Sequence, residues 1–199
     1  HPKSFDDLFV NLVDAGERSG ALESLLDKVD NEVTRLAAVR ALTRVSSSPL
    51  AIDLSAISAR AAAAFSPLVR QADHTMRAAA LQALISLAGA KAGAPDAESL
   101  AGAIKESAAL IVSDDLNLAA AALRLCVTSL HAAPAVSATV VDKALKPALQ
   151  LARSPLLQGG ALRALQAFFA ALASVNAPQA SFDELHSELM KAARDAVAA

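Results

Sequence analysis

A short pattern of apolar residues around a single polar residue occurs four times along the chain. The copies begin at Ala37, Ala79, Ala121 and Gly160 and read AAVRAL, AALQAL, AALRLC and GALRAL. Their first residues are 42, 42 and 39 positions apart. This period is typical of HEAT and armadillo repeats and exceeds the period of about 34 residues found in shorter helical repeats. The pattern predicts an all-α fold, a HEAT-repeat α-solenoid of roughly four to five stacked antiparallel helix pairs.

Residues that break or cap helices divide the chain into these pairs. The first helices are expected at approximately residues 20–29, 54–70, 97–112, 137–152 and 182–198. The second helices, which contain the repeated pattern, are expected at approximately residues 31–45, 74–88, 116–130 and 156–172, after a short helix near residues 5–13. We expect a single domain over residues 1–199, with repeats at about 20–46, 53–90, 95–131 and 135–175 and partial units at 4–15 and 181–199.

Short polar residues stand just before the expected second helices, where a side-chain oxygen can accept hydrogen bonds from free backbone N–H groups. We expect Asp30 and Asp73 to act as N-caps in the first two repeats, and Asp114 or Asp115 to do so in the third. In the fourth repeat the dipeptide Ser154-Pro155 has the composition of an N-cap followed by proline at the first helical position. The local residues therefore differ between repeats while the expected architecture stays the same.

Two prolines, Pro67 and Pro147, lie at matching places inside expected first helices. Proline cannot donate the backbone hydrogen bond of a helix interior, so a kink is expected at each place. HEAT repeats commonly have a proline at this point. The two prolines therefore favour a HEAT-like repeat over a pair of straight helices.

Two arginines fall close to the centre of the apolar stripes of the expected second helices. Arg35 follows Asp30, and Arg77 follows Asp73. We therefore expect a ladder of Asp and Arg side chains between adjacent turns, with each buried charge satisfied by the neighbouring repeat. The ladder breaks at Ala119, which occupies the arginine position in the third repeat.

Composition indicates which partners suit such an array. Hydrophobic residues make up 54% of the chain but aromatic residues only 3%, which suits a closely packed aliphatic helical core. The net charge is −2 and the isoelectric point is near 6.1, so we expect neither nucleic acid nor a membrane surface as a partner. The longest apolar stretches are far below the roughly 20 residues that span a bilayer. A lone cysteine fits a reducing compartment, which favours the cytoplasm or the nucleus.

Residues suited to catalysis, metal binding or cofactor binding are scattered along the chain. The histidines lack further ligands at metal-binding spacing; they are His1, His74, His131 and His186. Cys126 occupies a leucine position of the repeated pattern, which favours a buried packing thiol over a nucleophile. Gly159 and Gly160 have no Lys-Ser or Lys-Thr pair after them, as a phosphate-binding loop would require. We therefore expect no enzyme, no catalytic residue, no metal and no cofactor.

One set of residues suggests a binding surface. Arg40, Gln82, Arg124 and Arg163 occupy the same position of the repeated pattern, immediately after an apolar core position. That position lies about 100° around the helix from the core residue, so stacked helices would align the four side chains in a polar row. In a solenoid such a row follows the concave wall, where extended partners bind. The alternative is a solvated edge that only stabilises the stack.

Two longer strings of residues resemble a known family. Residues 26–42 read LDKVDNEVTRLAAVRAL and continue through SPLAIDL at 48–54, and residues 153–172 read RSPLLQGGALRALQAFFAAL. Both strings resemble the cullin-associated, neddylation-dissociated (CAND) family, and residues 154–162 are the clearest signature. Weaker similarity extends over nearly the whole chain.

The resemblance implies a HEAT solenoid that wraps the cullin scaffold of cullin-RING ubiquitin ligases when the cullin lacks its ubiquitin-like modification. Binding then competes with substrate-receptor adaptors and promotes their exchange. Family members are several times longer, and the resemblance assigns no contact residues to this chain. The alternative is a generic HEAT or armadillo scaffold, or a transport-type adaptor, unrelated to cullins. Because the chain starts at His1 and still has a helical pattern at its last residues, we expect an excised piece whose exposed terminal repeats self-associate weakly.

Overall fold

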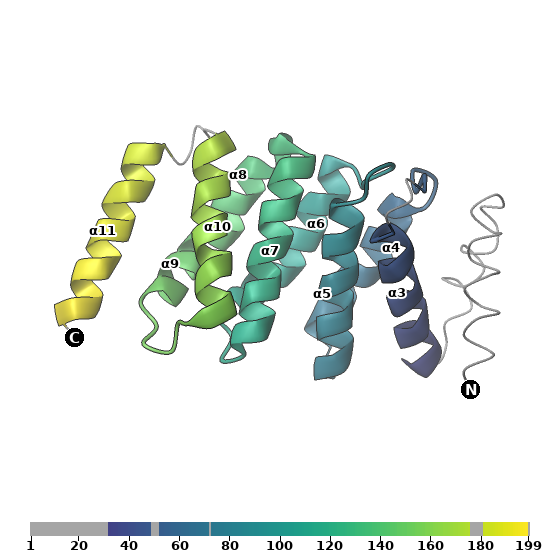
Figure 1. Cartoon of the computed structure of the whole chain (residues 1–199), viewed down its shortest axis with the longest axis horizontal. Coiled ribbons are helices and arrows are strands. Elements are labelled where there is room, and N and C mark those ends of the chain that lie inside the picture. The colour runs from purple at the N-terminus through teal and green to yellow at the C-terminus, as the bar shows by residue number, and fades with distance from the viewer. Residues whose placement is uncertain (1–31, 49–51, 72, 176–180, 199) are drawn as a thin grey trace. The chain divides into compact units, whose positions relative to one another are not determined.

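The computed structural model describes residues 32–48, 52–71, 73–175 and 181–198, and within these ranges all regular structure is helical (Figure 1). The predicted all-α helical-repeat fold is confirmed. The chain divides into two compact units, His1–Pro95 and Asp96–Ala199. The boundary falls in the loop expected between the second and third repeats. The expected helices at 5–13 and 20–29 and the expected N-cap Asp30 lie outside the described residues, and a single domain over 1–199 stays a prediction.

The described part of the first unit contains two second helices and the first helix between them. Its elements are α3 (Glu32–Ser46), α4 (Ser58–Phe65), the 3₁₀ helix η2 (Ser66–Arg70) and α5 (His74–Ala88). The two second helices, α3 and α5, pack against each other, and α4 and η2 both pack against α5. Their bounds agree with the sequence prediction to within a few residues.

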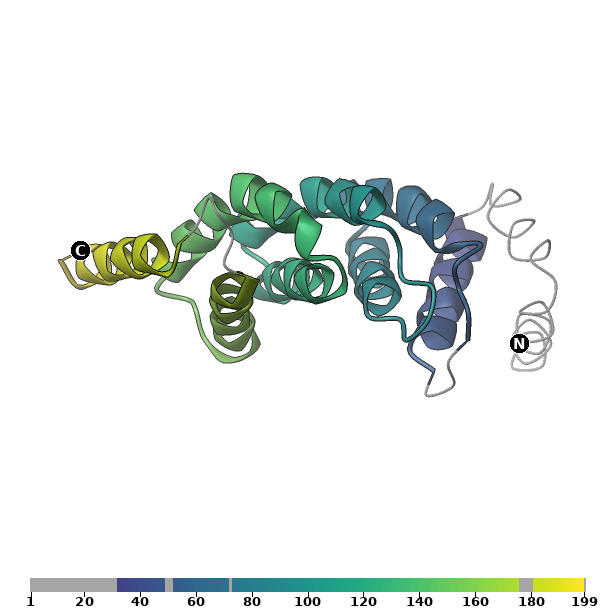
Figure 2. The same ribbon diagram turned by 90° about the horizontal axis from the view of Figure 1, so that it is seen from above.

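The second unit continues the same order of elements. They are α6 (Ala97–Ser107), η3 (Ala108–Val112), α7 (Leu116–Ala132), η4 (Pro134–Val136), α8 (Ser137–Val140), the π-helical turn η5 (Val141–Leu145), α9 (Lys146–Ala152), α10 (Gly159–Val175) and α11 (Phe182–Ala198). Within this unit α7 and α10 pack side by side in one layer, and α6, α8 and α9 form the other layer (Figures 1 and 2). This is the layering of stacked helix pairs.

The first helices change geometry near the places where kinks were predicted. Pro67 is the second residue of η2, and Pro147 is the second residue of α9, directly after the π-helical turn. The third repeat changes from α6 to η3 at Ala108 without any proline. The 3₁₀ ending is therefore shared by neighbouring repeats, and Pro67 fits this geometry rather than being its only cause.

Aspartate N-caps fix the starts of several helices. The Asp73 carboxylate accepts hydrogen bonds from the backbone N–H groups of Thr75 and Met76, at 3.2 and 2.8 Å. Asp115 caps α7 by accepting from the backbone of Asn117 and Leu118, which decides between the two aspartates considered at this turn. Both caps agree with the sequence prediction, and each satisfies donors that the helix itself leaves unpaired.

The predicted cap of the fourth second helix is wrong. The hydroxyl of Ser154 accepts a hydrogen bond from the backbone N–H of Leu156, at 3.3 Å, in a turn that precedes the helix. Helix α10 begins only at Gly159, whose φ of 58° lies in the left-handed region that glycine adopts readily. The chain therefore enters α10 through a glycine turn, and Ser154 stabilises the loop before it.

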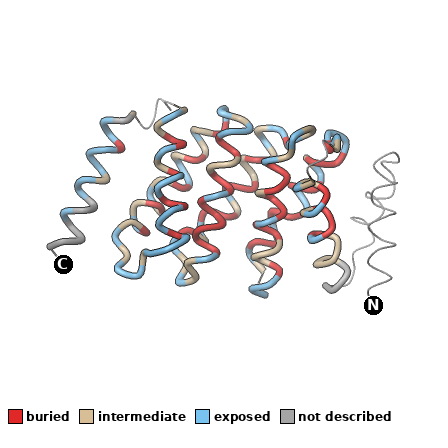
Figure 3. Tube along the Cα trace, viewed as in Figure 1, coloured by how far each residue is buried: buried red, intermediate tan, exposed pale blue. Residues whose placement is uncertain are grey.

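Aliphatic side chains on the facing sides of the helices form the core of each unit (Figure 3). Of the four residues expected at the core position of the repeated pattern, Val39, Leu81 and Leu123 are fully buried. Leu162 is 39% exposed, which contradicts the prediction. The reason is that α10 buries a single stripe that begins at Ala161, so Leu162 lies one position outside it.

The Asp/Arg ladder stays a prediction, because Asp30 lies outside the described residues. The Asp73 carboxylate accepts hydrogen bonds from the backbone of its own helix. Arg77 is half-buried, and its Nε atom is buried with no hydrogen-bond partner in the described part of the chain.

Candidate functional site

Two of the four residues of the predicted polar row lie together in the first unit. Arg40 on α3 and Gln82 on α5 are exposed, and both line a groove of about 450 Å³ between the two helices. The other residues that line this groove, named here the α3/α5 groove, are Thr43, Arg44, His74, Thr75, Ala78 and Ala79. The repeat period therefore identified one residue on each wall of the groove.

The α3/α5 groove has two arginines on its α3 side and two alanines on its α5 side. Arg40, Arg44 and His74 are all exposed, whereas Ala78 and Ala79 are half-buried. Small alanine side chains leave room between the helices, and the arginines supply planar hydrogen-bond donors suited to carboxylates. The sequence reasoning missed Arg44 and His74, although Arg44 lies one helical turn after Arg40 and this spacing places both on the same helix face.

The other two residues of the row lie on neighbouring helices of the second unit. Arg124 on α7 and Arg163 on α10 are exposed, and their helices pack side by side. The exposed positions Asn117 and His131 lie seven residues before and after Arg124, so they share its face of α7. This face of α7 therefore has exposed polar side chains at three positions, one near each end of the helix and one near its middle.

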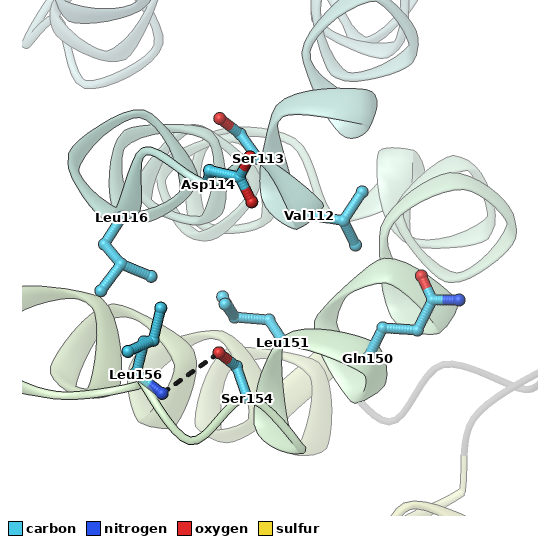
Figure 4. Close-up of a pocket in the computed structure, with 8 residues that line it drawn as sticks. All are labelled: Val112, Ser113, Asp114, Leu116, Gln150, Leu151, Ser154 and Leu156. Atoms are coloured by element: carbon cyan, nitrogen blue, oxygen red, sulfur yellow. Dashed lines mark hydrogen bonds between the residues drawn. The ribbon is translucent and has the colours of Figure 1, made fainter.

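A second concavity, of about 210 Å³, lies in the second unit between the turns of the third and fourth repeats (Figure 4). The residues that line it are Val112, Ser113, Asp114, Leu116, Gln150, Leu151, Ser154 and Leu156. Val112 is 47% exposed and Leu156 is 67% exposed, so two large apolar side chains are accessible at the same concavity. Figure 4 shows Asp114 and Leu116 on one side of the opening and Leu151 and Leu156 on the other. This arrangement suits an apolar side chain of a partner.

The sequence reasoning missed this turn pocket because its two halves are about 40 residues apart and meet only in the fold. One signal was available in the family signature itself. Residues 154–160 precede or open a helix, and Leu156 stands in this segment directly after Pro155, which cannot continue a preceding helix. A leucine in a loop of this kind either packs under the loop or is exposed for binding.

The described residues hold no group of three or more His, Cys, Asp or Glu side chains that could bind a metal ion. Cys126 is fully buried, and burial raises the pKa of its thiol to about 12. It therefore stays protonated and unsuited to act as a nucleophile. In the part of the chain that the structure covers, none of the helices combines the length and the apolar character needed to cross a bilayer.

Comparisons with known proteins show what the chain is similar to. No protein-family model matches it. It is 36% identical to cullin-associated NEDD8-dissociated protein 1 of Arabidopsis thaliana over 181 residues, which is 89% of this chain and 15% of that protein. It is also 36% identical to cullin-associated NEDD8-dissociated protein 2 of Rattus norvegicus over 165 residues, 83% of this chain and 13% of that protein. The resemblance inferred from the sequence is confirmed, and the chain spans about one seventh of the length of these relatives.

Two further similarities are more limited. A stretch of 28 residues, 14% of the chain, is 71% identical to the type IV pilus assembly protein PilC of Pseudomonas aeruginosa, but covers only 8% of that protein. The crystal structure of an engineered protein matches with a TM-score of 0.66 at 20% identity, covering 87% of this chain and 69% of that chain. The structural match supports the fold alone.

Proposed function

Because the chain belongs to the family of the cullin-associated NEDD8-dissociated proteins, of which it spans a segment, we propose that it is a non-catalytic part of a cullin-binding scaffold. The observation that carries this proposal is sequence similarity over more than four fifths of the chain to proteins that are named for their association with cullins. The longer protein would regulate the assembly of cullin-RING ubiquitin ligases and the exchange of their substrate receptors. The engineered protein of similar fold offers no support for an unrelated scaffold or a transport adaptor, since its likeness concerns the fold alone.

The surface proposed to contact the cullin is the polar row. Arg40 and Gln82 line the α3/α5 groove, and Arg124 and Arg163 are exposed on neighbouring helices of the second unit. The second helices that carry these side chains pack on a buried core, so a partner meets donors on a preorganised backbone. A long and shallow interface distributes its binding energy over many contacts. The partner can then be released when a competing adaptor binds, without any covalent step.

The preferred partner is the unmodified cullin-RING core, and we propose that binding takes place in the cytoplasm and the nucleus. The modification adds a bulky protein to the cullin, which would compete sterically with a scaffold wrapped around it. Weak self-association through exposed terminal repeats is a further part of this proposal, because a repeat that lacks its neighbour exposes an apolar face.

Titration calorimetry with an unmodified cullin-RING core tests the proposal. Saturable binding is expected for the full chain. The triple variant Arg40→Ala, Arg124→Ala, Arg163→Ala is expected to bind at least about tenfold more weakly, since each exposed charged contact contributes up to about 1 kcal/mol. Circular dichroism of the variant verifies that it remains helical.

A charge-matched control separates a contact surface from a general electrostatic effect. Arg60, Arg70 and Lys105 are exposed on first helices and lie outside the polar row. Changing all three to alanine removes the same charge and is expected to leave the affinity within about twofold, because exposed charges away from an interface contribute little. A folded chain that fails to bind the cullin core would overturn the proposal and would make this segment a spacer.

A further inference from the structure

We propose that the turn pocket binds a partner segment in which an aliphatic side chain stands directly beside a lysine or an arginine. The pocket is the concavity of about 210 Å³ between the turns of the third and fourth repeats, within the second unit (Figure 4). None of the described residues that line it belongs to the polar row, so the inference goes beyond the proposed function and does not depend on it. Three properties of the pocket support it: its exposed apolar side chains, its rigid turns and an available carboxylate.

The first property is an accessible apolar surface. Leu156 and Val112 are both exposed, and Leu116 and Leu151 line the same space. Leu156 has the largest exposed fraction of the large apolar side chains in the described part of the chain. The volume suits a single aliphatic side chain, because a cavity of about 150 Å³ already accommodates a benzene-sized apolar molecule. Covering these side chains removes apolar surface from water, which favours binding.

The second property is that local hydrogen bonds hold both turns of the pocket. The backbone N–H of Leu156 donates to the Ser154 hydroxyl, and the N–H of Leu157 donates to the Ser154 carbonyl, at 3.1 Å. On the opposite turn, the Ser113 hydroxyl accepts from the N–H of Asp115, also at 3.1 Å. The exposed apolar side chains are therefore carried by preorganised turns, which lowers the entropy lost when a partner binds.

The third property is a carboxylate that remains available to a partner. Of the two adjacent aspartates at the third turn, Asp115 caps α7. Asp114 is exposed, and in the described part of the chain its carboxylate has neither a hydrogen bond nor an ion pair. Figure 4 shows Asp114 at the edge of the opening, on the same side as Leu116. The Asp114 carboxylate can therefore accept hydrogen bonds from a cationic side chain of a partner.

The charges at the pocket favour a basic residue in the partner. None of the described lining residues is Lys, Arg or His, so Asp114 gives the lining a negative charge. Arg153 directly precedes Ser154 in the sequence, but it lies outside the lining and already has an interaction partner in the protein. A Lys or Arg beside the apolar residue of the partner would pair with Asp114, whereas an acidic residue there would be repelled. Gln150 is exposed, and its amide suits the backbone of an extended segment.

Methyl NMR titration of the full chain tests the inference. The probe is the peptide Gly-Ser-Gly-Leu-Lys-Gly-Ser-Gly with blocked ends, added up to about 5 mM, since one buried leucine and one exposed ion pair give a dissociation constant of about 1 mM. We expect saturable shifts of the methyl signals of the apolar lining residues, which are Val112, Leu116, Leu151 and Leu156. Replacing the leucine of the peptide with alanine is expected to weaken binding at least about tenfold, and replacing its lysine with glutamate at least about threefold.

Matched pairs of variants place the binding in the turn pocket. Leu156→Ser is expected to weaken binding at least about fivefold, whereas Leu162→Ser, which changes an exposed leucine outside the lining, is expected to change it less than about twofold. Asp114→Asn is expected to weaken binding about threefold, and Asp142→Asn, which removes an exposed charge outside the lining, to change it less than about twofold. The methyl spectrum of each variant verifies that the chain remains folded.

Reversing the charge of Asp114 decides the question even if Leu156→Ser fails to fold. Asp114→Lys is expected to bind the glutamate peptide more tightly than the lysine peptide, which reverses the preference of the original chain. A structural effect of the substitution would instead weaken the binding of both peptides alike.

Three results of the titrations would overturn the inference: no shift of the pocket methyl signals at about 5 mM peptide, equal binding of the lysine and glutamate peptides, or an unchanged preference of Asp114→Lys. Shifts of the same signals with protein concentration alone would also overturn it, because the occupant would then be a second copy of the chain. None of these results bears on the proposed function, which calorimetry with the cullin core and the polar-row variants tests separately.

Discussion

The hydroxyl of Ser47 donates a hydrogen bond to the hydroxyl of Ser86, 3.0 Å away, across 39 residues of sequence. Ser47 directly follows the last residue of α3, and Ser86 lies in the last turn of α5, where it is only 9% exposed. The bond joins the C-terminal ends of the two helices that form the α3/α5 groove. It therefore contributes to the separation of the groove walls.

Replacing either serine with alanine is expected to lower the free energy of unfolding by about 1 kcal/mol, because a partly buried hydrogen bond is lost. The double replacement is expected to cost less than the sum of the two single ones, with a coupling of about 0.5–1.5 kcal/mol. Urea unfolding followed by circular dichroism measures the free energy of unfolding of the original chain, the two single variants and the double variant. Additive effects would mean that the bond contributes nothing to stability.

Gly93 occupies a position of the first unit that only glycine suits. Its φ is 70°, in the left-handed region, and an added Cβ would collide with the backbone of Leu54 and Ser55. We expect Gly93→Ala to destabilise the chain by at least about 2 kcal/mol, since both backbone strain and displacement of residues 54–55 are required. The midpoint of urea unfolding measures this effect.

Gly102 provides the matched control for the same substitution. It lies inside α6, and an added Cβ would find no atom within 4 Å. Gly102→Ala is expected to stabilise the chain by about 0.5–1 kcal/mol, because alanine loses less backbone entropy in a helix. A similar response of the two glycine variants would contradict the close approach described at Gly93.

The sequence predicted most accurately those helix bounds that depend on residues directly beside the helix. The bounds of α5 and α11 were predicted to the residue. Asp73 and Gly89 stand directly beside α5, and Ser181 stands directly before α11. The start of α10 was missed because Ser154-Pro155 looks locally like a cap, whereas the turn made by Gly159 depends on a left-handed backbone that composition does not reveal. A local pattern also could not show that Leu162 lies outside the buried stripe of α10.

The candidate site likewise has residues that a local pattern predicts and residues that only the fold brings together. The repeat period placed Arg40 and Gln82 at equivalent positions, and the two residues do line one groove. The turn pocket at Leu156 depends on two loops that are distant in sequence, so no local pattern predicts it. Arg44 and His74 join the α3/α5 groove through the packing of α3 on α5, which the repeated hexapeptide alone does not describe.

Asp96 links the stability of α6 to pH. Its carboxylate accepts a hydrogen bond from the backbone N–H of Ser99, at 2.8 Å, and this bond holds the pKa of Asp96 below its ordinary value of 3.8. Because the pKa is lower in the folded state, the contribution of Asp96 to stability is fully present above the unfolded value and is lost as the pH falls through the folded one.

Thermal unfolding between about pH 5 and pH 2 measures this dependence. Asp96→Asn keeps a side-chain oxygen that can cap the helix but cannot titrate. The variant is therefore expected to lose less stability than the wild type as the pH is lowered from 5. Parallel curves for the two proteins would contradict a role of the Asp96 charge.

The reaction rate of the Cys126 thiol reports how often the structure around α7 opens to solvent. Its thiol is fully buried in α7, and burial raises its pKa from 9.0 to about 12. At pH 8 this change alone lowers the thiolate fraction by about a thousandfold. We expect the native chain to react with a thiol reagent at least about a thousandfold more slowly than the chain in guanidinium chloride, because only the thiolate reacts and burial also blocks access. Stopped-flow absorbance with an aromatic disulfide measures both rates, and native labelling within tenfold of the denatured rate would show that α7 opens without global unfolding.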